Sequence, residues 1–164
     1  MAQGNWVKVE WPPEPEPTSI PYNIAIVLAK FIQERNPNFE LCGSLALMLY
    51  GLLPKGEVHD LDFASAKCVT KPKDCKQTKQ TSRSIRNQRS NYICYGFKYE
   101  VDCLSIHYDV FYYPELESGA TVDGLKLQSA DQIIFFKRQF NRPKDKEMLS
   151  KIDTALDNML LGIE

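Results

Sequence analysis

Two aspartates one residue apart, Asp60 and Asp62, are the residues of this chain whose spacing most directly suggests chemistry. They stand in GEVHDLDF, residues 56–63, whose last part has the apolar character of a buried strand. Residues i and i+2 of a strand point to the same face, so the two carboxylates would project together. Buried charges are costly unless they are paired or bind a metal. Carboxylate oxygens suit hard divalent cations, so the pair predicts a site for one or two such ions, with Mg²⁺ the first choice.

A third aspartate stands in a similar apolar stretch farther along the chain. Asp109 lies in HYDVFYY, residues 107–113, where aromatic and β-branched residues favour a strand. If that strand lies beside residues 58–64, three carboxylates converge. Two alternatives stay open: the pair of aspartates is solvated at a strand end, or Asp109 forms a structural ion pair with Lys137 or Arg142.

A Gly-Ser pair, Gly43 and Ser44, precedes the aspartates at a predicted strand-to-helix junction. Glycine lets a backbone approach a ligand closely. The free N–H groups at the start of a helix, together with the Ser44 hydroxyl, can hold a phosphate. The simpler alternative is a tight turn followed by a helix cap.

The elements expected to position these residues combine helices and strands in an α+β fold, with a small mixed β-sheet flanked by helices. Apolar residues at helical spacing predict helices over residues 21–34, 45–53, 129–140 and 144–161, with Ser129 and Gln132 as a capping box. Apolar and aromatic runs predict strands over residues 39–42, 58–64, 92–101, 103–113 and 125–127. Residues 67–90 lack apolar periodicity and predict a long loop, or a polar helix in its second half. Residues 114–124 predict a further loop.

The chain is expected to form one domain, residues 21–164, preceded by an extended proline-rich arm over residues 1–20. A basic insertion, residues 66–90, carries eight lysines and arginines against one aspartate, in a chain of formal net charge −1. Such a segment is commonly a solvated loop, but beside a phosphoryl-transfer site it could contact RNA, tRNA or a triphosphate. The candidate nucleic-acid contacts are Lys71, Lys73, Lys76, Lys79, Arg83, Arg86 and Arg89.

Cysteine usage and hydropathy predict a cytoplasmic protein without a membrane partner. The five cysteines are odd in number and none has CxxC spacing, which favours reduced thiols over a disulfide framework or a zinc site. The longest apolar run, residues 45–53, is about half of the ~20 residues that a spanning helix needs.

Three stretches together resemble the polymerase-β-like nucleotidyltransferase superfamily. They are LCGSLALMLYGLLPKGEVHDLDFAS (residues 41–65), YDVFYYP (residues 108–114) and DQIIFFKRQFNRPKDKEMLSKI (residues 131–152). The resemblance is to the small bacterial members, namely the minimal nucleotidyltransferases and the toxin components of type IV abortive-infection systems. The chain departs from the pattern at Cys42, which stands where the first glycine is expected, and in its basic insertion.

The resemblance implies a metal-dependent nucleotidyl transfer. Asp60 and Asp62 would bind two Mg²⁺ (or Mn²⁺) ions, and Asp109 would bind one of them and help to deprotonate the acceptor hydroxyl. The acceptor would attack the α-phosphorus of an NTP, and pyrophosphate would leave. Paired metal ions suit such an in-line displacement, because they stabilise both the attacking and the leaving oxygens.

The resemblance also implies how the nucleotide is held. Gly43 and Ser44 would bind the β- and γ-phosphates, and Lys137 and Arg142 would be further nucleotide-binding residues. The acceptor could be RNA or tRNA, a protein side chain or a small molecule.

The main alternative function is a catalytically inactive module of the same fold, which binds nucleic acid or a protein partner, encoded by a phage or acting as a toxin–antitoxin component. That reading predicts that Asp60 and Asp62 are dispensable, whereas charge reversal in residues 71–89 is harmful. The enzyme reading predicts the opposite order.

Overall fold

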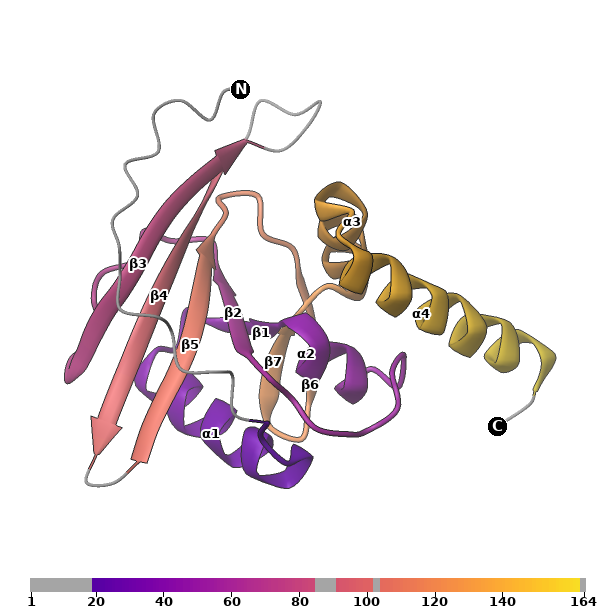
Figure 1. Ribbon diagram of the computed structural model, residues 1–164, viewed down its shortest axis with the longest axis horizontal. Coiled ribbons are helices and arrows are strands. Elements are labelled where there is room, and N and C mark those ends of the chain that lie inside the picture. The colour runs from indigo at the N-terminus through magenta and orange to yellow at the C-terminus, as the bar shows by residue number, and fades with distance from the viewer. Residues whose placement is uncertain (1–18, 85–90, 102–103, 163–164) are drawn as a thin grey trace.

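The computed structural model describes residues 19–84, 91–101 and 104–162, which form a mixed sheet with helices packed against it (Figure 1). The sheet has seven strands in the order β3-β4-β5-β2-β1-β7-β6. The strands are β1 (Glu40–Cys42), β2 (Leu61–Ser65), β3 (Cys75–Ser84), β4 (Asn91–Val101), β5 (Leu104–Tyr112), β6 (Ser118–Val122) and β7 (Leu125–Gln128). The helices are α1 (Tyr22–Arg35), α2 (Gly43–Leu49), α3 (Ala130–Phe140) and α4 (Pro143–Leu161).

The sheet is mixed, as predicted, but it is larger than the small sheet that the sequence suggested. Strands β2 and β5 pair in parallel, as do β1 and β7, and the other neighbours are antiparallel. Two strands missed in the sequence, β3 and β6, supply the two edges. Long β3 and β4 form one side of the molecule, and α4 runs away from the sheet on the other side (Figure 1).

The prediction of a loop or polar helix over residues 67–90 is wrong for β3. This edge strand pairs with β4 over ten residues, yet most of its described side chains are polar and at least partly exposed to water. Backbone hydrogen bonds hold such a strand, so its side chains need not alternate between apolar and polar. The same reason explains β6, whose exposed residues lie in the predicted loop over residues 114–124.

Two core clusters hold the layers together. The main one buries Leu41, Phe63 and Val110 from the sheet together with Ala29 and Leu45 from α1 and α2. The second is aromatic and lies between α3 and the strands β4 and β5. It contains Tyr92, Cys94 and Tyr113 with Phe111, Phe135, Phe136 and Phe140 packed against them.

Several helix and strand ends differ from the prediction. Helix α2 stops at Leu49 rather than at residue 53, because Gly51 takes φ +78° and the Leu52 N–H turns back to the Leu47 carbonyl. Strand β2 begins at Leu61, three residues later than predicted, and Val58 instead makes an isolated bridge with Ile20.

The predicted capping box of α3 forms only in half. The Ser129 side chain accepts from the Gln132 N–H, as expected for an N-cap. The Gln132 side chain instead donates to the Glu115 carbonyl and accepts from the Glu117 N–H. These two hydrogen bonds of the Gln132 side chain connect α3 to the segment before β6.

Two further expectations concern the whole chain. The predicted arm lies outside the described residues as far as residue 18, and the structure describes only its last two residues, Ser19 and Ile20. Among the described residues, none of the helices combines the length and the apolar character that crossing a bilayer requires.

Candidate functional site

Strands β2 and β5 lie side by side and bring two of the three predicted aspartates together. Asp62 is the direct neighbour of Asp109 in the parallel register. On its other side Asp62 pairs with Cys42, the last residue of β1. Directly paired residues share a face of the sheet, so both carboxylates project on the side that α3 covers in part.

Gly43 packs directly against the Asp62 carboxylate. A Cβ atom at residue 43 would lie 2.5 Å from Asp62 Oδ2, and Gly43 also has φ +71°, which disfavours any other residue. Glycine is therefore required here for close approach as well as for the turn from β1 into α2. Ser44 follows within the first turn of α2.

Burial, the largest cause, together with the neighbouring carboxylates of Asp109 and Asp60 raises the pKa of Asp62 to about 7. Lys137 and Lys144 oppose the shift. A carboxyl group with this pKa lacks enough positive charge around it, and a divalent cation would supply that charge. The adjacent Asp62 and Asp109 thus fit a single hard cation.

Asp60 lies outside β2, in the segment that leads into it. It is exposed and precedes the strand on which the sequence predicted it, although its carboxylate still contributes to the raised pKa of Asp62. Within the described part of the chain, no three histidine, cysteine or acidic side chains approach closely enough to hold a metal ion. The expected convergence of three carboxylates is therefore not assembled in this structure.

Asp109 has a cationic partner that the sequence did not suggest. Lys79 Nζ lies 3.2 Å from Asp109 Oδ2, and the two side chains are 40% and 27% exposed. Lys137 and Arg142, the partners that the sequence suggested for Asp109, approach Asp145.

Asp145 fixes the two cations at the corner between α3 and α4. Its carboxylate lies 2.7 Å from Arg142 Nε and 3.8 Å from Lys137 Nζ, and its side chain is 1% exposed. Burial alone would raise the pKa of Asp145, but hydrogen bonds from the Arg142 side chain and N–H outweigh it and hold the pKa below its usual range. The site therefore has two cations at one end, both in contact with one buried carboxylate.

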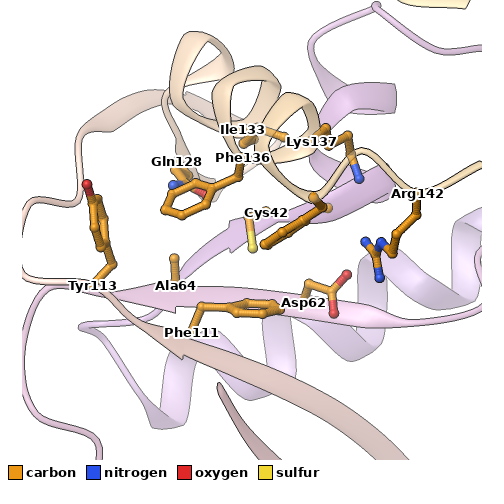
Figure 2. Close-up of a pocket in the computed structure, with 12 residues that line it drawn as sticks. Cys42, Asp62, Ala64, Phe111, Tyr113, Gln128, Ile133, Phe136, Lys137 and Arg142 are labelled. Atoms are coloured by element: carbon orange, nitrogen blue, oxygen red, sulfur yellow. The ribbon is translucent and has the colours of Figure 1, made fainter. Parts of the chain in front are cut away.

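A cavity of about 80 Å³ opens between α3 and the sheet beside Asp62 (Figure 2). Asp62, Lys137 and Arg142 lie at one end of it, and Tyr113 and Gln128 lie at the other. Its remaining lining is mostly apolar and aromatic: Cys42, Gly43, Ala64, Phe111, Ile133, Phe136 and Phe140. Burial raises the pKa of Cys42 well above its usual value, which makes this thiol a poor nucleophile.

Three aromatic residues that line this site, Phe111, Phe136 and Phe140, were not predicted from the sequence. Phe111 could have been found, because it stands two residues after Asp109 on the same strand face. The two α3 residues carried no such signal, because an aromatic stripe on a helix is as typical of a core.

Of the candidate nucleic-acid contacts whose side chains the structure describes, three have partners within the protein. Lys71 donates to the Cys75 carbonyl at 2.8 Å, Lys76 lies 3.7 Å from Glu100, and Lys79 lies against Asp109. Lys73 is exposed in the turn before β3. Arg83 belongs to β3, but its side chain lies outside the described part of the chain, as do Arg86 and Arg89.

Comparison with known proteins finds no matching protein-family model and no matching curated protein. Among solved structures, the chain is similar to the crystal structure of a "putative nucleotidyltransferase from H. pylori", with 18% sequence identity and a TM-score of 0.37. The similarity covers 71% of this chain and 54% of that one, so the chain spans about half the length of that protein. At this TM-score the similarity carries no weight for function.

Proposed function

We propose that this protein is a metal-dependent nucleotidyltransferase, which moves a nucleoside monophosphate from an NTP to an acceptor hydroxyl on RNA or tRNA, a protein or a small molecule. The observation that carries the proposal is the register pair Asp62 and Asp109, packed against the backbone of Gly43 at the mouth of a cavity. Carboxylates that bind a cation, beside fixed cations that bind phosphate, are what such a transfer requires.

Asp62 and Asp109 would hold Mg²⁺ or Mn²⁺, with Asp60 joining them from the segment before β2. The bound ion would lower the charge on the phosphate oxygens and so ease nucleophilic attack. A bond forms between the acceptor oxygen and the α-phosphorus, and the bond from that phosphorus to the pyrophosphate oxygen breaks. Asp109 would accept the proton of the acceptor hydroxyl.

The cationic end of the cavity would receive the triphosphate. Lys137 and Arg142 both contact Asp145. Gly43 lines the same cavity as these two cations and Asp62, and Ser44 follows it in α2. The enclosed space of about 80 Å³ is small beside the ≈ 300–1,000 Å³ of typical ligand pockets. We therefore place phosphate groups within it and the rest of the nucleotide along its open side.

The inactive binding module is the second candidate, and two observations favour it. Asp60 is exposed and lies outside β2, and Asp109 is paired with Lys79. This candidate predicts that the protein binds no NTP through Asp62, whatever the metal ion.

The first test is thermal melting with each of ATP, CTP, GTP and UTP, with and without Mg²⁺. A ligand that binds the native state raises the melting temperature by mass action. We expect a rise that needs both an NTP and the metal, that is lost in Asp62→Asn, and that is kept in Asp153→Asn, which removes an exposed carboxylate on α4. Absence of a rise with all four nucleotides would favour the binding module.

The second test separates nucleotidyl transfer from phosphoryl transfer. The protein is incubated with total tRNA or with itself as acceptor and with NTP labelled at either the α- or the γ-phosphate. Nucleotidyl transfer deposits the α-label on the acceptor and releases the γ-label as pyrophosphate. Deposition of the γ-label instead would contradict the proposed reaction.

A further inference from the structure

The ion pair between Lys79 and Asp109 joins two strands that are not neighbours. Lys79 belongs to β3 and Asp109 to β5, with β4 between them. Strands lie ≈ 4.8 Å apart, so the lysine and aspartate side chains together span about 10 Å across the face of β4. An ammonium group placed this way needs an open path over the middle strand.

Gly96 provides that path. In the register of the sheet, Gly96 is the residue of β4 that faces Lys79 on one side and Asp109 on the other. A Cβ atom at residue 96 would lie 2.7 Å from Lys79 Cγ and 2.6 Å from Thr78 Oγ1. The missing side chain therefore leaves the groove in which the lysine lies.

A bulge in β3 puts Lys79 on the correct face. The pairing runs from Gln77 with Phe97 directly to Lys79 with Gly96, so Thr78 is the extra residue. Regular pairing would place Lys79 opposite Tyr95 and turn its side chain to the other face of the sheet. Bulges that re-aim a side chain are frequent next to active sites.

We propose that Lys79 is a positioning residue of the candidate site, which neutralises Asp109 in the metal-free protein and competes with a divalent cation for that carboxylate. The inference rests on the proposed function, because it takes Asp109 as a metal ligand. A cation bound to Asp109 releases the lysine ammonium at the open side of the site. The nearest new anion for it is then a phosphate of the substrate, so metal binding and substrate binding are coupled through one side chain.

The direct test is titration of the metal-free protein with Mn²⁺, with free Mn²⁺ measured by electron paramagnetic resonance. Lys79→Met should lower the Kd for Mn²⁺ about three- to fivefold. This change corresponds to the interaction free energy of a partly exposed ion pair. Lys76→Met is the matched control, because Lys76 lies on the same strand and face but pairs with Glu100. It should leave the Kd unchanged.

Three outcomes separate this inference from the proposed function. Tighter Mn²⁺ binding in Lys79→Met, with an unchanged Kd in Lys76→Met, supports the inference. An unchanged Kd in Lys79→Met, with binding still lost in Asp62→Asn, overturns the inference and leaves the proposed function standing. Failure of the wild type and of Lys79→Met to bind Mn²⁺ overturns both.

A double-mutant cycle excludes a purely structural ion pair. The unfolding of the wild type, Lys79→Met, Asp109→Asn and the double variant is measured without metal and with saturating Mn²⁺. The coupling between the two positions should be present without metal and lost with it. Equal coupling under both conditions would overturn the inference, and Lys79→Gln replaces Lys79→Met if that variant does not fold.

Discussion

At the scale of single residues, the contact between Gly43 and Asp62 defines the candidate site. It combines a left-handed glycine, φ +71°, with a carboxylate that occupies the place of a Cβ atom. Burial of this carboxylate, to which the packing of Gly43 contributes, is the largest cause of its raised pKa.

Gly43→Ala should lower the free energy of unfolding by about 2–4 kcal/mol, from the left-handed backbone and from overpacking against Asp62. Gly124→Ala is a matched control. Gly124 has φ +80°, but a Cβ atom there would meet only Lys30 Cε, at 3.9 Å. The control should lose only the backbone contribution, about 1–2 kcal/mol. Equal losses in urea denaturation of the two variants would show that the contact with Asp62 adds no strain.

Asp62→Asn should stabilise the metal-free protein at pH 8 but not at pH 4. The pKa of Asp62 is about 7 in the folded protein against 3.8 as its ordinary value. The native state thus binds the extra proton between these values, and wild-type stability falls as pH rises through that window. The variant lacks this loss, so its advantage should grow from zero near pH 4 to about 1–4 kcal/mol above pH 7. Urea denaturation across this range checks it, and an advantage independent of pH would contradict the assignment.

At the scale of elements, the corner between α3 and α4 places the cationic end of the cavity. Asn141 ends α3 in the left-handed conformation, Arg142 is the N-cap of α4, and Pro143 opens that helix. Asp145 closes a reciprocal capping box with Arg142 and also approaches Lys137. One buried carboxylate thus fixes the angle between the helices and the position of two cations.

Asp145→Asn should lower the free energy of unfolding by about 2–4 kcal/mol, because it leaves Lys137 and Arg142 without their counter-charge in a partly buried position. Asp131→Asn, at an exposed position in the first turn of α3, should cost less than about 1 kcal/mol. Chemical denaturation measures both. A loss in Asp145→Asn no larger than in the control would mean that the corner is held by packing alone.

At the scale of the whole molecule, the body of the protein covers only the first half of α4. The first half of α4 is anchored by Asp145 and Ile152, both of which are buried. Its second half carries Leu156, Met159 and Leu160, which are 40%, 55% and 85% exposed. The apolar stripe of α4 therefore continues beyond the body that it packs on (Figure 1).

Amide hydrogen exchange should divide α4 into two parts. Local stability follows buried contacts, so amides in residues 153–162 should exchange at least about tenfold faster than those in residues 144–152. Mass spectrometry of peptides from the two halves checks this. Uniform protection along the helix that increases with protein concentration would mean that a second copy covers the stripe.

The sequence by itself determined the elements that have strong local signals. The apolar stripes of α1, α3 and α4, the Ser129 cap and the apolar runs of β1, β2, β5 and β7 suffice to find them. It also identified Gly43, Asp62 and Asp109 as residues of one candidate site. These signals are local because each lies within one helix or strand, in the spacing of the side chains that this element turns toward the protein core.

Only the tertiary structure decided the edges of the sheet and the partners within the site. Strand β3 has no apolar pattern, because its backbone pairing with β4 rather than side-chain burial holds it. The approach of Lys79 to Asp109 depends on a bulge at Thr78 and on Gly96, in strands distant in sequence from Asp62. Register between strands is set by long-range pairing, so no local pattern could predict that a lysine of the basic segment reaches this carboxylate pair.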